Sequence, residues 1–284
     1  MKYNIESETD LEKALNEARN GDTIDGQGLP LTIKNEYYVI NRNLKLINLN
    51  FTYIQNIDKT QDNNISLFTV REGAGIEMDR CLVTGDSNYL DCFVKTHNAR
   101  YLIADNCKLY FSRYSAIWLA KCNYSLITNS KFLLESPFSY GYGIWQGGRG
   151  DAKNNQLTVK DCSFYDCRHA IAGSYHTNHI HIEDNDFYDT TQQVLDRHAG
   201  DYNNNNAQGV GGGNYTVIGN TFHGTGHRSV DVQIPLDNYE VRVENNVFPR
   251  KFGENMKFES IAGISNESNV NHPQIIIGTN YYTQ

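Results

Sequence analysis

The sequence predicts an all-β protein wound into a parallel β-helix, and two observations carry the prediction. A short phrase ending in an apolar anchor recurs eight times along the 284 residues, and a second short apolar strand lies between successive copies. No helical periodicity separates the copies. Short strands at this period bury little apolar surface alone and become stable by stacking, as solenoids do.

The repeated phrase reads apolar, any residue, apolar, any residue, Asn or Asp, two residues and then the anchor. Steps between successive anchors range from 23 residues (109 to 132) to 35 residues (187 to 222), which places the length variation in loops. The expected anchors are Leu82, Leu109, Phe132, Phe164, Phe187, Phe222, Phe248 and Tyr282.

The Asn or Asp of the phrase predicts a turn in every coil, because these residues tolerate the left-handed backbone conformation. We expect their side chains to form a hydrogen-bonded ladder between stacked coils, and we assign them no catalytic role. The residues at this position include Asp79, Asn106, Asn129, Asp161, Asp184 and Asn245.

The first 28 residues predict a cap on the stack, formed by a short helix and the first strand. Thr9 or Asp10 is the expected N-cap, and Gly21 is expected to stop the helix. The segment Asp22–Gly26 follows as the start of the first coil. An apolar stripe at helical spacing consists of Leu11, Ala14, Leu15 and Ala18.

A short amphipathic helix that runs into Gly-Asp-Thr-Ile at residues 21–24 resembles the cap of right-handed parallel β-helix proteins of the pectin-lyase-like superfamily. The resemblance covers nearly the whole chain, so it implies one domain over residues 1–284 and a right-handed coil. The superfamily includes pectate and alginate lyases, polygalacturonase-type hydrolases, polymannuronate epimerases and phage tailspikes. It therefore implies a polysaccharide partner, and tailspike-like association into a homotrimer is one alternative.

Composition excludes several other classes of protein. The net charge of -8 argues against a nucleic-acid partner, and no apolar run is long enough for membrane insertion. The six cysteines contain no C-x-x-C pair and are expected as buried free thiols in a reducing compartment. No apolar run follows Lys2, so no signal peptide is expected. Localisation stays open between a virion-associated or cytoplasm-made protein and a secreted protein without its leader.

Two long insertions predict the walls of a glycan groove. One lies at residues 147–155 and the other at residues 199–213, on either side of a short coil whose residues 168–176 would form the floor. Seven of the nine histidines lie between His169 and His227, and histidine is the side chain whose pKa suits proton transfer near neutral pH.

The second strands of the coils predict which side chains face this groove. We align them on the inward residues Phe93, Ile117, Ile144, Ile171, Leu195 and Val230. The next residues then point outward as Val94, Trp118, Trp145, Ala172, Asp196 and Asp231, and a second outward row contains Thr96, Ala120, Gly147, Ser174, His198 and Gln233. Tryptophan beside carboxylate, imidazole and amide groups suits a sugar-binding surface, because an indole stacks on a pyranose ring.

These residues favour a lyase or epimerase that acts on an acidic, uronate-containing glycan. A cation would neutralise the uronate carboxylate, and a base would remove the C5 proton. Asp196-Arg197-His198 resembles the Asp-Pro-His-Asp signature of polymannuronate epimerases, but Arg197 replaces the proline and Ala199 the final Asp. The resemblance nominates His198 as base, oriented by Asp196. Candidate cations are Arg168, Arg197, Lys153 and Arg149, and further candidate bases are His169, His176 and Tyr175.

Two other functions remain open. A glycoside hydrolase would use Asp196 and Asp231 as its carboxylate pair, although the polygalacturonase signatures are absent. A phage-tail or surface protein would bind glycan without chemistry. We predict no cofactor and no zinc site, with calcium bridging a uronate to either carboxylate as an alternative.

Overall fold

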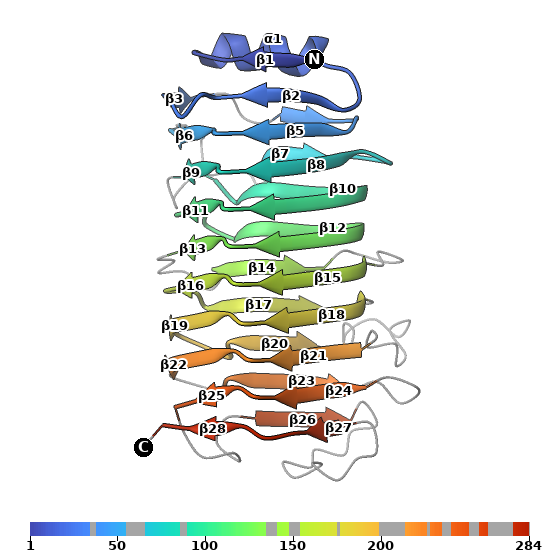
Figure 1. Cartoon of the computed structure of the whole chain (residues 1–284), viewed down its shortest axis with the longest axis vertical. Coiled ribbons are helices and arrows are strands. Elements are labelled where there is room, and N and C mark those ends of the chain that lie inside the picture. Colours follow the sequence, from blue (N-terminus) through green and yellow to red (C-terminus); the bar gives the residue numbers. More distant parts are fainter. Residues whose placement is uncertain are drawn as a thin grey trace, which may run out of the picture.

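The computed structural model describes residues 1–34, 38–54, 66–85, 90–134, 141–147, 154–174, 177–198, 214–225, 228–234, 240–249, 256–260 and 275–283. Its strands form coils stacked along one long axis, with the N-terminus at one end and the C-terminus at the other (Figure 1). Every strand pairing is parallel, and each coil contributes up to three strands. The predicted all-β parallel β-helix is confirmed.

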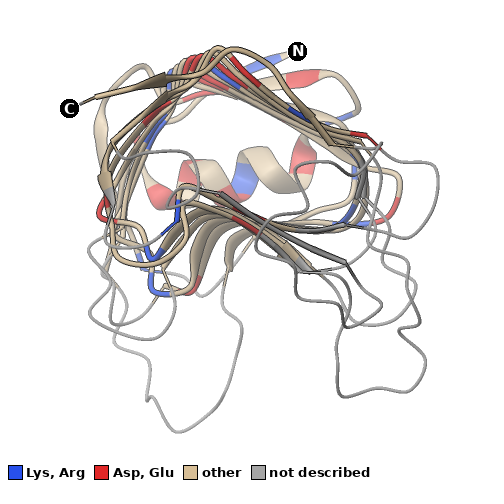
Figure 2. Cartoon of the chain, turned by 90° about the horizontal axis from the view of Figure 1, so that it is seen from below, with Lys and Arg blue, Asp and Glu red and all other residues tan. Residues whose placement is uncertain are grey.

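The strands form three stacks, which enclose a common core when viewed along the axis (Figure 2). The first stack consists of β4 (Tyr38–Ile40), β7 (Ser66–Val70), the first half of β10 (Cys92–Asp105), the first half of β12 (Ser115–Thr128), β14 (Tyr142–Gln146), β17 (His169–Ser174), β20 (Leu195–His198), β23 (Val230–Ile234) and β26 (Met256–Ser260).

The second stack lies beside the first. It consists of β1 (Lys2–Asn4), β2 (Asp22–Asp25), β5 (Leu44–Ile47), β8 (Gly75–Asp79), the second halves of β10 and β12, β15 (Asn154–Lys160), β18 (Thr177–Glu183), β21 (Asn214–Ile218), β24 (Val241–Glu244) and β27 (Ile275–Ile277). Because β10 and β12 run through both stacks, hydrogen bonding joins the two into one 18-stranded sheet.

The third stack is a separate 10-stranded sheet that carries the anchors. It consists of β3 (Pro30–Ile33), β6 (Asn50–Tyr53), β9 (Leu82–Thr84), β11 (Lys108–Tyr110), β13 (Lys131–Leu133), β16 (Ser163–Tyr165), β19 (Asp186–Thr190), β22 (Thr221–Thr225), β25 (Val247–Phe248) and β28 (Tyr281–Tyr282).

The N-terminal cap is the helix α1 (Glu8–Glu17), which lies across the end of the stack (Figure 1). Its predicted apolar stripe is buried at Leu11, Ala14, Leu15 and Ala18. The N-cap is Ser7 rather than Thr9 or Asp10, because the Ser7 hydroxyl accepts from the Asp10 amide while the Asp10 carboxylate accepts from the Ser7 hydroxyl and the Glu6 amide. The helix ends at Glu17 with Ala18 as its C-cap, before the predicted stop at Gly21.

The turn between the second and third strands adopts the predicted left-handed conformation. Its φ values are positive at Asn106, Asn129, Asp161, Asp184, Gly219 and Asn245. In the first copy of the repeat the turn residue is Arg80 rather than Asp79, and the anchor is Val83 rather than Leu82. The sequence phrase is one residue shorter in that copy, whereas the fold keeps the full spacing from Met78 to a fully buried Val83.

The ladder forms one residue later than predicted. The turn residues are exposed, and the residue after each of them points inward. Asn220 donates from Nδ2 to the carbonyl oxygens of Ile182 and Ile218 at 3.0 Å each, and its Oδ1 accepts from the amide and side chain of Asn185 at 2.9 Å each. Asn246 and Asn280 repeat this pattern in the following coils.

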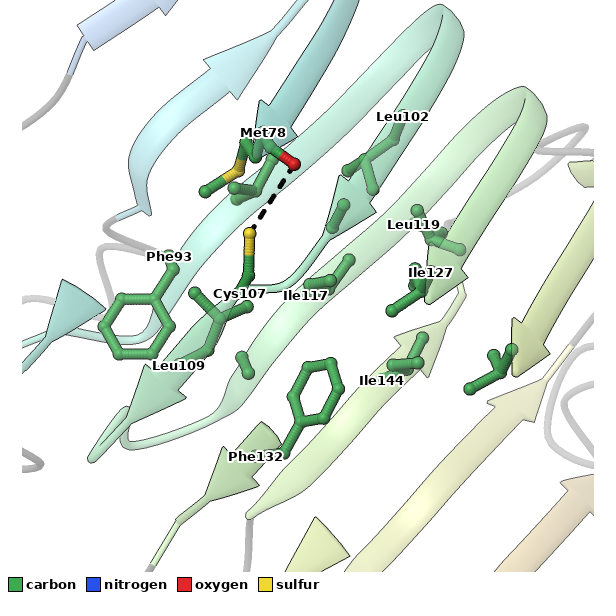
Figure 3. Close-up of a cluster of buried hydrophobic side chains, with 14 of the residues drawn as sticks. Met78, Phe93, Leu102, Cys107, Leu109, Ile117, Leu119, Ile127, Phe132 and Ile144 are labelled. Carbon is green, nitrogen blue, oxygen red and sulfur yellow. Dashed lines mark hydrogen bonds between the residues drawn. The ribbon is translucent and has the colours of Figure 1, made fainter. Parts of the chain in front are cut away.

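Thiols occupy the same column nearer the N-terminus. Each thiol of Cys81, Cys107 and Cys162 lies within hydrogen-bonding distance of two backbone carbonyls, one in its own coil and one in the preceding coil, and its single S–H can donate to either. Figure 3 shows the bond from Cys107 to Met78. Burial raises the pKa of Cys162 to about 12. All six cysteines are free and buried, as predicted.

In the core, side chains at equivalent positions of successive coils stack into columns. The anchor rings of Phe132 and Phe164 stack with centroids 4.5 Å apart, and Phe187, Phe222 and Phe248 continue the column. Aliphatic side chains from the first and second stacks pack against these rings inside the coil (Figure 3). Of the predicted anchors beyond the first copy, those from Leu109 to Phe248 are buried, and Tyr282 at the end of the stack is exposed.

We expect Asn220→Ala to destabilise the fold by about 3 kcal/mol, because it leaves two buried carbonyls and the Asn185 donors without their partner. Urea unfolding followed by circular dichroism measures the change. Asn245→Gly, at an exposed left-handed turn position, is the control and should cost less than about 1 kcal/mol. Equal effects of the two variants would contradict the role of the ladder.

Candidate functional site

The outer face of the first stack carries one continuous row of side chains, which we call the site row. Strand registers pair Trp118 with Trp145, Trp145 with Ala172, Ala172 with Asp196, and Asp196 with Asp231. The predicted order of these five residues is therefore confirmed. Neighbouring members lie about 4.8 Å apart along the axis.

The member of the row before Trp118 is Lys95, not Val94 as the alignment predicted, and the same register continues beyond it to Thr69 and Val39. Register pairs Lys95 with Trp118 and His97 with Ala120, while Val94 and Thr96 are fully buried. The error arises because each coil places two consecutive residues inside at this corner. In most coils the first of the two is small, like Ala116 or Ala170, but here it is the large Phe93, which looks like the aligned inward residue.

Aromatic rings surround the first part of the row. Tyr114 stacks on Trp118 with centroids 5.0 Å apart and meets Trp145 edge-on at 6.3 Å, and Tyr142 lies 4.6 Å from Trp145. The Trp118 Nε1 donates to the Gly147 carbonyl at 2.6 Å. Both indoles are only partly buried. They therefore present part of their apolar surface to solvent on a fixed scaffold, where a sugar ring can contact it.

Gly147 makes room for one of these indoles. A Cβ added there would lie 2.7 Å from Nε1 and 2.9 Å from Cε2 of Trp145, so the indole occupies the space above this glycine. Any side chain at Gly147 would push the ring away from the strand. Gly147 thus determines where Trp145 lies.

The second part of the row is acidic and closely packed. Asp196 and Asp231 are only 6% and 8% exposed, although both point away from the core. Asp196 Oδ2 lies 3.4 Å from His169 Nδ1, and Asp231 Oδ2 lies 3.6 Å from Arg228 Nη1. The Arg228 guanidinium therefore flanks Asp231, and the His169 imidazole flanks Asp196.

The His169 side chain is buried and packed against its neighbours, not exposed to solvent. It is 3% exposed, its Nδ1 lies 2.7 Å from the Gln193 carbonyl oxygen, and its ring stacks on Tyr142 at 5.4 Å. The preceding residue, Arg168, donates from Nη1 to the Tyr142 hydroxyl at 3.2 Å and is partly exposed. Arg168 therefore brings a cation to the coil that contributes Ala172.

Several predicted site residues cannot be placed with their side chains. Arg149, Tyr175, His176, Lys153 and Ala199, with most of the two predicted wall insertions, lie outside the described residues. For Arg197, His198 and Gln233 the structure gives the backbone alone: His198 pairs with Ser174, and Gln233 pairs with Glu259. These registers put the backbone of His198 two residues beyond Asp196 on β20.

Sequence reasoning missed four residues of this face, namely Lys95, Tyr114, Tyr142 and Arg228. Only the strand register with the neighbouring coil shows that Lys95 faces outward. Tyr114, Tyr142 and Arg228 lie at the corner that leads into each strand, where no periodic pattern marks them.

Within the described residues, no group of three or more His, Cys, Asp or Glu side chains is placed to hold a metal ion. His181 lies 3.0 Å from Glu183, whereas His179 is exposed and within 3.5 Å of the Asn214 side chain. The described helix is too short and too polar to cross a membrane.

We expect Gly147→Ala to displace Trp145 and change tryptophan emission, because the added methyl group would overlap the indole. The chain contains two tryptophans, both in the site row, so intrinsic fluorescence reports directly on this face. Far-ultraviolet circular dichroism should stay unchanged. Thr158→Ala, on the second stack, is the control, and emission identical to wild type in both variants would contradict the proposed packing.

No family model matches the chain, and a search of curated proteins finds no similar sequence. Solved structures do match in three dimensions. The alginate lyase AlyGC of the PL6 family superposes over 100% of this chain with a TM-score of 0.61 and 11% identity. A single-residue variant of that lyase gives a TM-score of 0.60 and 12% identity. The chain spans 39% of the length of that enzyme. The chain thus has the right-handed parallel β-helix fold that this lyase shares.

Proposed function

We propose that this protein binds an acidic polysaccharide along the site row and cleaves it by β-elimination. The observation that carries the proposal is the order of the row, in which two tryptophans are followed by a small residue and then by two carboxylates. A linear glycan running along the stack would meet a stacking surface first and charged groups next. The structural likeness to an alginate lyase supports the same class of chemistry.

The reacting sugar would lie above Ala172. Ala172 has the smallest side chain of the row and lies between Trp145 and Asp196 in the register, and Arg168 lies on the same coil. Arg168 is suited to pair with the uronate carboxylate, because a guanidinium binds a carboxylate through two parallel hydrogen bonds. That pairing would stabilise the negative charge that develops when the adjacent carbon loses its proton.

His198 is the proposed base. It would take the C5 proton, the C5–H electron pair would form the C4–C5 double bond, and the C4–O bond would break. The departing oxygen then takes a proton from water or from a neighbouring acid. Asp196 would orient this region, with the buried His169 ring beside its carboxylate at 3.4 Å.

Hydrolysis is the second candidate, because Asp196 and Asp231 pair in register on neighbouring coils. A coil spacing of about 4.8 Å is close to the separation of about 5–5.5 Å between the carboxyl groups of retaining glycosidases. In that case one carboxyl group would protonate the leaving oxygen and the other would attack the sugar.

Incubation with alginate, pectate and glycosaminoglycans should produce the ultraviolet absorbance of an unsaturated uronate from at least one substrate. New reducing ends without that absorbance would show that the protein is a hydrolase and not a lyase. Glycan binding without either product would make the protein a binding module. Parallel reactions with calcium and with EDTA test whether a cation takes part.

His198→Ala should lower kcat/KM by about 100-fold or more, because it removes the base, and Asp196→Asn should lower it by about tenfold or more. Asp186 and His223 form a carboxylate–imidazole pair of 2.8 Å on the third stack and supply matched controls. Asp186→Asn and His223→Ala should leave kcat/KM unchanged. If both site variants kept full activity while Trp145→Ala abolished it, the reacting centre would lie elsewhere along the row.

A further inference from the structure

We propose that Lys95 and Trp118 form a separate subsite that binds an anionic sugar several residues away from the reacting one. The inference rests on the proposed function for the kind of ligand, a glycan laid along the site row. It adds a requirement of its own, namely that the glycan carry a carboxylate or sulfate group at the far end of that row.

Lys95 is held in place as a cation on this face. Its Nζ lies 3.9 Å from the centroid of the Trp118 ring, and its side chain is partly buried. Among the residues that the structure describes, no carboxylate lies within 4.0 Å of this ammonium group. By contrast, Arg113 at the corner of the next coil lies 2.6 Å from Asp91, and Arg228 lies 3.6 Å from Asp231.

An ammonium group that is partly desolvated and has no described carboxylate within 4.0 Å favours an incoming anion, because the nearest acidic charge, Asp91, acts on it only from a longer distance. Burial lowers the pKa of Lys95, which means that the charged form has lost hydration. An anion bound beside Nζ would restore favourable interaction to that charge, while the exposed part of the Trp118 indole, which Lys95 and Tyr114 also contact, would touch the same sugar. Tyr114, stacked on Trp118, keeps the indole in position.

The register sets how far this subsite lies from the chemistry. Trp118 and Trp145 lie between Lys95 and Ala172, so three coil spacings, or about 14 Å, separate the two. Asp196 is one coil further, at about 19 Å from Lys95. A disaccharide above Ala172 cannot reach Lys95, whereas a hexasaccharide can. The contribution of Lys95 should therefore depend on the length of the substrate.

The test compares Lys95→Gln with wild type on alginate-derived and galacturonate-derived disaccharides and hexasaccharides. KM for the acidic hexasaccharide that the protein uses should rise by about tenfold or more, with kcat within about twofold, because a charge-assisted contact is lost away from the reacting bond. KM for the disaccharide should not change. Lys95→Arg, which keeps the charge, should restore most of the affinity for the hexasaccharide.

Lys131→Gln is the matched control, because Lys131 Nζ lies 4.4 Å from the Tyr165 ring on the third stack in the same kind of contact. It should leave both KM values unchanged. Added salt should raise KM of the wild type for the hexasaccharide and have a smaller effect on Lys95→Gln. Equal KM values for Lys95→Gln and wild type, or equal losses on the two chain lengths, would overturn the inference.

The same variants separate this inference from the proposed reaction. If no substrate is turned over, the dissociation constants of the hexasaccharides are measured by tryptophan fluorescence. Binding that weakens about tenfold in Lys95→Gln would then sustain the subsite while the elimination reaction fails. Turnover of acidic glycans with no dependence on Lys95 would sustain the reaction and overturn the subsite. The absence of both binding and turnover would overturn both.

Discussion

The parallel, in-register hydrogen bonding between successive coils is the interaction on which the rest of the structure depends. Each coil pairs with the next residue by residue, so side chains of the same rank lie above one another at about 4.8 Å. Equivalent positions of successive coils thus form a column, and the residues of an inward column meet the same environment in each coil. The anchor column is apolar, and the turn column adopts positive φ from Arg80 to Asn245.

The buried column after the turn shows how different residues meet one demand. In this column Asn185, Asn220 and Asn246 bind carbonyl oxygens of two coils at once and link the coils through their side-chain amides. Cys107 and Cys162 meet the carbonyl part of the demand with a thiol. An amide has two donor hydrogens and so bonds both carbonyls at once, whereas a thiol has only one, and a buried polar group without such bonds would be costly. The column therefore contributes stability and no chemistry.

Outward columns have no such common demand, so their residues are free to differ from coil to coil. The site row uses this freedom to present a cation, two indoles, a methyl group and two carboxylates in sequence along the axis. The stiffness of the stack holds these groups at regular spacing, which suits a polymer ligand whose units also repeat. Rigid placement of this kind lowers the entropy that binding must otherwise overcome.

Periodicity in the sequence was enough to predict the fold, the left-handed turn and the order of the site row from Trp118 to Asp231, because each depends on a pattern that recurs from coil to coil. Periodicity did not show which residues of a strand face outward where two neighbouring residues are equally apolar. Phe93 and Val94 are both buried, and only pairing with Ser115 and Ile117 on the next coil identifies Lys95 as the outward residue. Likewise, the burial of His169 follows from Tyr142 and Gln193, which belong to neighbouring coils. Contacts between coils decide these points, because residues 24 to 27 positions apart become neighbours only when the chain has stacked.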